Sequence, residues 1–126
     1  MRVKRYVTFF AALADENRLR LLHLMRDGEI CVCYLQGALK TNQPKISRHL
    51  AYLRRAGLVD ARREGKWIYY SIKKQTGKFG ALLKEALKAV GEEERIKGDV
   101  ERAKRIQCAP ERFGLSVPKG ELGIMN

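Results

Sequence analysis

Residues 40–72 read KTNQPKISRHLAYLRRAGLVDARREGKWIYYSI, and this stretch decides the fold. Its first half predicts a helix after a tight turn, because Thr41 or Asn42 suits the N-cap and Pro44 suits the first helical turn. Gly57 is typical of the residue that follows a helix C-terminus. We therefore expect a helix of about four turns between these signals.

This helix has one apolar side and one basic side. Ile46, Leu50 and Leu53 recur at helical spacing and predict a buried stripe. The far side carries a mainly basic set, which comprises Lys45, Arg48, Tyr52 and Arg55. A basic helix with a single exposed face is the result.

The second half of the stretch predicts a β-hairpin. Residues 58–63 form the first expected strand, residues 64–66 turn the chain, and residues 67–72 are rich in β-branched and aromatic side chains. The tip carries Arg62, Arg63 and Lys66. This charge suits a wing that lies against the phosphate backbone of DNA.

A short helix expected at 31–39 completes the pattern. The order of short helix, turn, basic helix and basic hairpin predicts a winged helix-turn-helix, whose second helix enters the major groove. The residues expected near base edges and adjacent phosphates are Gln43, Lys45, Ser47 and Arg48. His49 lies on the flank of the apolar stripe and is assigned to DNA contact rather than to a metal. Arg62, Arg63 and Lys66 should contact mostly backbone.

The rest of the chain is expected to be mainly helical. Amphipathic patterns cover 3–14, 16–26 and 79–90, so the fold class is mainly α with a β-hairpin (α+β), in the order α-α-α-α-β-β-α. The first and last of these helices have apolar stripes without an obvious partner in the chain, and we expect them to form a dimer interface. Residues 1–92 should be the DNA-binding and dimerisation domain, and 93–126 a partly ordered C-terminal extension.

Charge and composition favour a nucleic-acid partner. The 126 residues carry a net charge of +12, and residues 40–74 hold ten Lys or Arg against two Asp or Glu. No apolar run approaches the roughly 20 residues that span a bilayer, and no signal peptide is evident, so we expect a cytoplasmic protein without membrane contact. Neither a phosphate-binding glycine loop nor a Ser/His/Asp set is present, so an enzyme is not expected.

Two of the three cysteines stand together at the start of the short helix. Cys31 and Cys33 offer soft thiolate donors, which prefer trivalent arsenic, antimony, cadmium or lead, and a helix N-terminus lowers a thiol pKa. Positions i and i+2 of a regular helix lie about 200° apart, so we expect ligand binding to distort this helix and displace the DNA-reading helix. The alternative is that both cysteines are small core residues.

Four segments carry a resemblance to a known family: LADENRLRLL (13–22), EICVCYL (29–35), NQPKISRHL (42–50) and LRRAGLV (53–59). The chain resembles the ArsR/SmtB family of bacterial metal-responsive repressors, in particular the arsenite-responsive type. The resemblance implies a homodimer, joined by its first and last long helices, that binds a palindromic operator and leaves it when a metal ion or metalloid binds.

The resemblance also exposes a gap in the thiol set. Arsenite sensors of the family carry a third cysteine where this chain has Gln36, so Cys108 is the remaining candidate for the third ligand, from either subunit, and a plain free thiol is the alternative. The family's other site, built from His and carboxylates on the last helix, is disfavoured because the only histidines are His23 and His49. No resident cofactor is expected.

We therefore expect a repressor that leaves operator DNA when As(III) or Sb(III) binds Cys31, Cys33 and Cys108. One alternative keeps the DNA binding and changes the signal to cadmium, lead or oxidants. A second alternative is a constitutive DNA-binding protein with structural cysteines.

Overall fold

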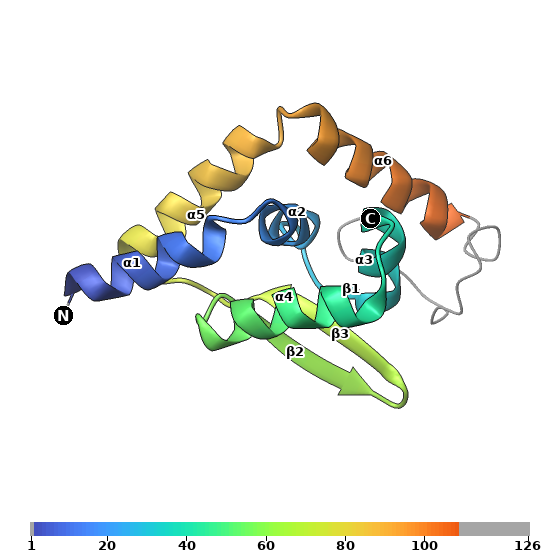
Figure 1. Ribbon diagram of the computed structural model, residues 1–126, viewed down its shortest axis with the longest axis horizontal. Coiled ribbons are helices and arrows are strands. Elements are labelled where there is room, and N and C mark those ends of the chain that lie inside the picture. The colour runs from blue at the N-terminus through green and yellow to red at the C-terminus, as the bar shows by residue number, and fades with distance from the viewer. Residues whose placement is uncertain (1, 109–126) are drawn as a thin grey trace.

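The computed structural model describes residues 2–108, and the side chains of residues 3–106 (Figure 1). Within this range the elements are α1 (Arg2–Leu13), α2 (Glu16–Leu24), β1 (Ile30–Cys31), α3 (Val32–Leu39), α4 (Gln43–Arg55), β2 (Val59–Glu64), β3 (Trp67–Ile72), α5 (Gly77–Val90) and α6 (Glu94–Cys108). The expected class, mainly α with a β-hairpin, is confirmed. None of the described helices combines the length and the apolar character needed to cross a membrane.

Local capping signals fix where the central helices begin and end. The Asp15 side chain accepts a hydrogen bond from the Arg18 amide at 3.0 Å at the start of α2. The Asn42 side chain accepts one from the Lys45 amide at 2.9 Å at the start of α4. After α4 the chain turns through Gly57 at φ 80°, a conformation that glycine adopts without strain. The predicted signals at both ends of α4 are thus confirmed.

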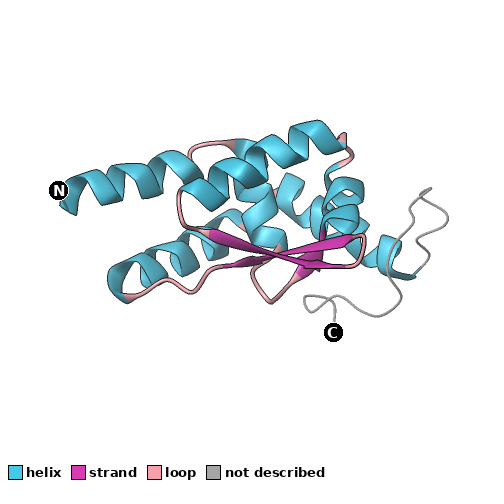
Figure 2. Cartoon of the chain, turned by 90° about the horizontal axis from the view of Figure 1, so that it is seen from below, coloured by secondary structure: helices cyan, strands magenta, loops and turns pink. Residues whose placement is uncertain are grey.

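The hairpin belongs to a sheet with one strand more than predicted. The order is β1-β3-β2, all antiparallel, with β3 in the centre. Seen from below in Figure 2, the strands form a short twisted sheet among the helices. The added strand β1 places Cys31 opposite Tyr69, so the thiol segment pairs directly with the wing. Two residues are too short for a periodic signal, so the sequence pattern missed this strand.

The core lies between α2, α3 and α4. Its fully buried side chains include Leu21, Leu35 and the predicted stripe of α4, Ile46, Leu50 and Leu53. In Figure 1, α4 and the hairpin occupy the same side of the molecule, at the bottom of the view. The core therefore holds the two predicted DNA-contacting elements in a fixed relation.

Helices α1 and α5 lie together at one side of the molecule, at the left of the view (Figure 1). The rings of Tyr6 and Phe79 stack with centroids 4.6 Å apart, and Phe9 also contacts Phe79. Other apolar side chains of this pair remain exposed: Val3, Val7, Phe10 and Leu82. The exposed side chains match the apolar surface that the sequence predicted for these helices.

Helix α6 packs most extensively on α3 (Figure 1). Ala103 and Ile106 are buried in the main core. The Arg102 guanidinium donates to the Ala38 carbonyl, and Arg20 donates to the Leu39 carbonyl at 3.5 Å. The last carbonyls of α3 are thus held by arginines from two neighbouring helices. The predicted division into a domain of residues 1–92 and an extension of residues 93–126 stays a prediction.

Candidate functional site

The outward face of α4 presents the residues predicted to reach DNA. Gln43, Lys45, Ser47 and Arg48 are all exposed. Because Ile46 and Leu50 beneath them are buried, this face has a fixed orientation. The structure thus brings together the four polar side chains at the start of the predicted reading helix, and their contacts with DNA stay predictions.

His49 lies at the edge of this face and turns toward α2. Its Nδ1 is 3.7 Å from Oδ2 of Asp15, and its side chain is 19% exposed. Burial lowers its pKa, opposed by the Asp15 carboxylate. The ring is therefore placed against the start of α2, and its assignment to DNA contact remains a prediction.

A stacked arginine that the sequence pattern did not single out braces α4. The Arg18 guanidinium lies over the Tyr52 ring, 4.0 Å from its centroid, and donates to the carbonyls of Ala11 and Ala12. Tyr52, placed on the outward face by its helical position, is half-buried under this contact. Arg18 therefore ties the reading helix to the end of α1.

The hairpin arginines are not equivalent. Arg62 donates to both carboxylate oxygens of Glu29 at 2.8 Å and pairs with Glu64, while its guanidinium lies 4.5 Å from the centre of the Tyr69 ring. The hydrogen bonds from Arg62 lower the pKa of Glu29. Arg63 and Lys66 are exposed. The positive charge of Arg62 is thus largely neutralised, which leaves the other two as the stronger phosphate ligands of the predicted set.

Cys31 is not part of a helix, which corrects the expected geometry of the thiol pair. It is the N-cap of α3, with φ −71° and ψ 142°, and it lies in β1. Its extended backbone removes the 200° separation expected for two helical positions, and the Cys33 thiol hydrogen bonds to the Cys31 sulfur. The two thiols therefore interact while α3 begins regularly at Val32.

The two thiols differ in acidity and access. The hydrogen bond from Cys33, aided by backbone amides including that of Ile68, lowers the pKa of Cys31 to about 7 despite burial. The same contact, followed by burial, raises the pKa of Cys33. Cys31 is fully buried and Cys33 is partly exposed. The pair thus combines a buried thiol of lowered pKa with a partly exposed thiol.

A small cavity lies between the Cys33 thiol and both predicted DNA-contacting elements. Its volume is about 260 Å³, and it is lined by Cys33, by Gln43 of α4, and by Lys66 and Trp67 of the hairpin. The Cys33 thiol, the first residue of α4 and the tip of the hairpin therefore border one cavity.

The described side chains do not complete a metal site. Among them, no group of three or more His, Cys, Asp or Glu side chains is placed to hold an ion. The third predicted ligand, Cys108, ends α6, and its side chain lies outside the described residues. The described part of the site is thus the two-sulfur pair alone.

Comparisons of the sequence point to one family. The model for "Bacterial regulatory protein, arsR family" matches residues 15–61. The arsenic resistance transcriptional regulator ArsR1 of Pseudomonas putida is 48% identical over 82 residues, which are 64% of this chain and 64% of that protein. The match thus spans slightly less than two thirds of that relative. The arsenical resistance operon repressor of Escherichia coli is 40% identical over 105 residues, 82% of this chain and 88% of that protein.

Solved structures agree with the sequence comparison. HlyU from Vibrio cholerae aligns with a TM-score of 0.64 at 31% identity, covering 70% of this chain and 94% of that chain. The segment matched by the family model, residues 15–61, includes the N-cap of α2, the thiol pair, α4 and the start of the hairpin. These relatives are transcriptional regulators rather than enzymes. The chain therefore belongs to the ArsR family of bacterial regulatory proteins.

Proposed function

We propose that this regulator is a cytoplasmic, homodimeric repressor that binds operator DNA and releases it when trivalent arsenic or antimony binds its thiols. The observation that carries the proposal is the cavity shared by Cys33, Gln43 and Lys66. The cavity lies beside the Cys33 sulfur and beside both elements that are expected to contact DNA, which supports a coupling between ligand and DNA binding. The arsenic resistance regulators among its relatives support the choice of inducer.

The chemistry of the thiol pair suits this inducer. Arsenite, As(OH)₃, exchanges hydroxyl groups for thiols, so that each new As–S bond releases one water molecule. The hydrogen bond between the two thiols lowers the pKa of Cys31 and so favours a thiolate within the pair, and the partly exposed Cys33 gives the inducer access to it. Cys108 would supply the third sulfur, from the same subunit or the other one. Soft sulfur donors select As(III) and Sb(III) over hard cations.

The contacts around the pair suggest how binding weakens DNA affinity. An arsenic atom between the sulfurs must enlarge a fully buried position at Cys31, since that side chain has no exposed surface. Cys31 pairs with Tyr69 in the sheet, and Glu29 just before it holds Arg62. The insertion therefore shifts the wing relative to α4, and the ligand favours the state that does not fit the groove.

The exposed apolar side chains of α1 and α5 support the dimer. Val3, Val7 and Phe10 are at least half exposed, and Leu82 lies on the adjoining helix. Such a patch is typical of a subunit interface. A two-fold dimer would present two copies of α4 to two half-sites of a palindromic operator.

DNA release measured by fluorescence anisotropy tests the proposal. A labelled duplex, selected for binding from a random pool, is titrated with the reduced protein and then with arsenite, antimonite, cadmium, zinc or peroxide. Stoichiometric arsenite or antimonite should release the DNA, and Cys31→Ser and Cys33→Ser should abolish that release while leaving DNA affinity intact. Failure of arsenite at stoichiometric concentration would refute the proposed inducer.

A second candidate signal is an oxidant. The contact between the two sulfurs and the low pKa of Cys31 favour oxidation of the pair as well as metalloid binding. The titration with peroxide distinguishes the two signals. An oxidant sensor should release DNA when peroxide is added and bind it again after a thiol reductant is added. If neither ligand nor oxidant changes DNA binding, the chain is a constitutive DNA-binding protein with structural cysteines.

A further inference from the structure

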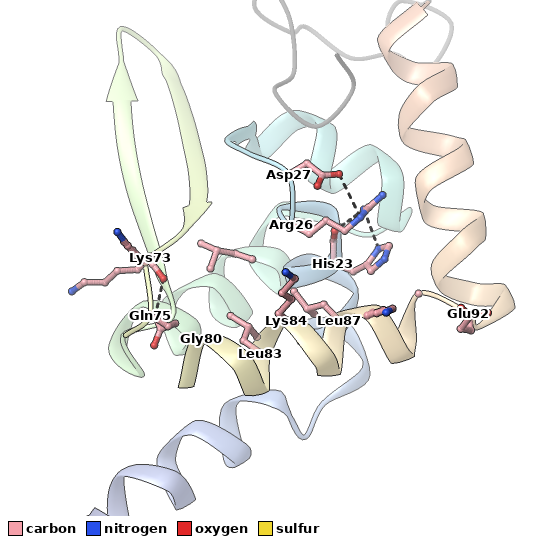
Figure 3. Close-up of a pocket in the computed structure, with 14 residues that line it drawn as sticks. His23, Arg26, Asp27, Lys73, Gln75, Gly80, Leu83, Lys84, Leu87 and Glu92 are labelled. Carbon is pink, nitrogen blue, oxygen red and sulfur yellow. Dashed lines mark hydrogen bonds and ion pairs between the residues drawn. The ribbon is translucent and has the colours of Figure 1, made fainter. Parts of the chain in front are cut away.

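A cavity of about 600 Å³ lies away from the thiol pair, between the C-terminal end of α2, the chain leaving β3, and α5 (Figure 3). This volume is in the range of sites that hold small organic ligands. The close-up shows Leu83, Lys84 and Leu87 of α5 on one wall, with His23, Arg26 and Asp27 opposite them. The arsenic-sensing proposal makes no use of this cavity.

The lining divides into an apolar part and a cationic part. Ile72, Leu83 and Leu87 contribute aliphatic surface. Lys84 and Lys88 stand one turn apart on α5, and neither forms an ion pair within the described part of the chain. The Asp27 carboxylate is paired with Arg26 at 3.5 Å. The four lysines of the lining outnumber its other carboxylate, Glu92, so the site keeps a net positive charge; they are Lys73, Lys74, Lys84 and Lys88. Such a lining favours an anion attached to an apolar body.

His23 adds a directed hydrogen-bond donor. Arg26 Nη1 lies 3.3 Å from His23 Nδ1, and a guanidinium can only donate, so Nδ1 is the acceptor. The ring is neutral near pH 7 because burial lowers its pKa to about 4, and its proton is therefore on Nε2. A Cβ at Gly91 would lie 2.9 Å from this Nε2, so any side chain at position 91 would obstruct the donor.

The cavity does not share the face of α5 that carries the exposed apolar side chains. Leu82 and Lys84 are two positions apart, which is about 200° around a helix. An interface built on Phe10 and Leu82 would therefore leave the Lys84 face accessible.

We propose that this cavity binds a small organic carboxylate with an aliphatic or aromatic body. The carboxylate accepts the His23 Nε2 proton and lies beside Lys84 and Lys88, while the body covers Ile72, Leu83 and Leu87. The site is independent of the thiols, so binding is expected equally in a Cys31→Ser, Cys33→Ser protein.

Calorimetric titration with three probes tests this proposal. The probes are octanoate, octanol, which keeps the apolar body without the charge, and inorganic phosphate, which keeps a charge without the body. Octanoate should bind at least about tenfold more tightly than either of the other two, as expected when a charged hydrogen bond and apolar burial act together. In ¹H–¹⁵N spectra it should shift the Gly91 amide and the His23 ring nitrogens. Equal binding of octanol or of phosphate would overturn the proposal.

Matched variants locate the site. Lys84→Glu, Lys88→Glu should weaken octanoate at least about tenfold, whereas Lys78→Glu, Lys104→Glu makes the same charge change on exposed positions outside the cavity and should leave the affinity unchanged. Gly91→Ala should also weaken octanoate, because the added methyl meets His23 Nε2. Equal affinities in the two double variants would place octanoate elsewhere and refute the assignment.

Discussion

Arg20 and Asp99 form a buried, two-pronged ion pair that joins α2 to α6. Both Nε and Nη2 of the guanidinium lie 2.8 Å from the carboxylate oxygens, and the side chains are 6% and 2% exposed. Arg102 on α6 also approaches the carboxylate, at 3.5 Å. The hydrogen bond with Asp99 raises the pKa of Arg20. The C-terminal helix is thus bonded to the core by charge as well as by apolar packing.

Asp99→Ala should destabilise the protein by about 3–5 kcal/mol, because it leaves the buried Arg20 charge without a partner. The free energy of unfolding from urea titration measures this loss. Glu101→Ala is the matched control, since Glu101 is exposed and only reaches Arg105 at 4.0 Å. That change should cost less than about 0.5 kcal/mol. Equal effects of the two changes would show that the buried pair does not stabilise the fold.

DNA contacts of the reading helix and of the wing should differ in specificity. We expect the Arg48 side chain to contact a base. Arg48→Ala should therefore weaken binding to the selected operator by about 1–3 kcal/mol and change the affinity for random DNA little. Lys66→Ala should weaken both DNAs alike and reduce the salt dependence by about one counterion. Anisotropy titrations at several salt concentrations measure both. Equal losses on both DNAs for Arg48→Ala would make that residue a phosphate contact.

A third thiol within α3 should replace Cys108. Gln36 follows Cys33 by three residues, so it lies on the same side of the helix. We expect Cys108→Ser to raise the arsenite concentration needed for DNA release, and Gln36→Cys in that background to restore the response. The anisotropy assay with arsenite measures both steps. An unchanged response of Cys108→Ser would exclude Cys108 as a ligand.

The buried His23 should make stability depend on pH. Burial and the nearby Arg26 charge lower its pKa from 6.5 to about 4, against the smaller opposing effects of Asp27 and Asp99. The unfolded chain therefore binds the proton more readily, so the contribution is complete above pH 6.5 and is lost as the pH falls toward 4. The loss is at most about 3 kcal/mol. Urea titrations across this range should show a steeper decline for the native protein than for His23→Gln.

The exposed patch of α1 should control the oligomeric state. Phe10→Glu places a charge among the exposed apolar side chains and should shift a dimer to a monomer at micromolar concentration, as measured by analytical ultracentrifugation. Thr8→Glu makes the same charge change at an exposed position about 200° away on the helix and should remain dimeric. If the Phe10→Glu protein were still dimeric, the dimer interface would have to lie on another surface.

Short-range signals in the sequence were sufficient to predict α4, the helix expected to enter the DNA groove. The N-cap Asn42, the apolar stripe of α4 and Gly57 each act within a few residues, and the structure confirms all three. The aromatic contact between Tyr6 and Phe79 also follows from apolar stripes on helices that needed a partner.

The rest depends on residues that are distant along the chain. Arg20 and Asp99 are 79 positions apart, and Arg62 and Glu29 are 33 apart, so no local period encodes either pair. The pairing of Cys31 with Tyr69 likewise gives no sequence signal. The sequence predicted two thiols on opposite sides of a helix, whereas in the structure the two thiols are joined by a hydrogen bond.

The two ends of α3 are held in different ways: Cys31, at its start, pairs with Tyr69 of the wing, and its last carbonyls accept hydrogen bonds from arginines. Arginines from α2 and α6 hold the carbonyls of Ala38 and Leu39, while the opposite end carries the two sulfurs. A helix of eight residues is about 12 Å long, so a tilt of about 10° around its C-terminal end moves its N-terminal end, and the strand paired with it, by about 2 Å. Gln43 and Lys66 line the cavity at that N-terminal end. A ligand that tilts α3 would therefore cause the largest displacement where the protein is expected to meet DNA.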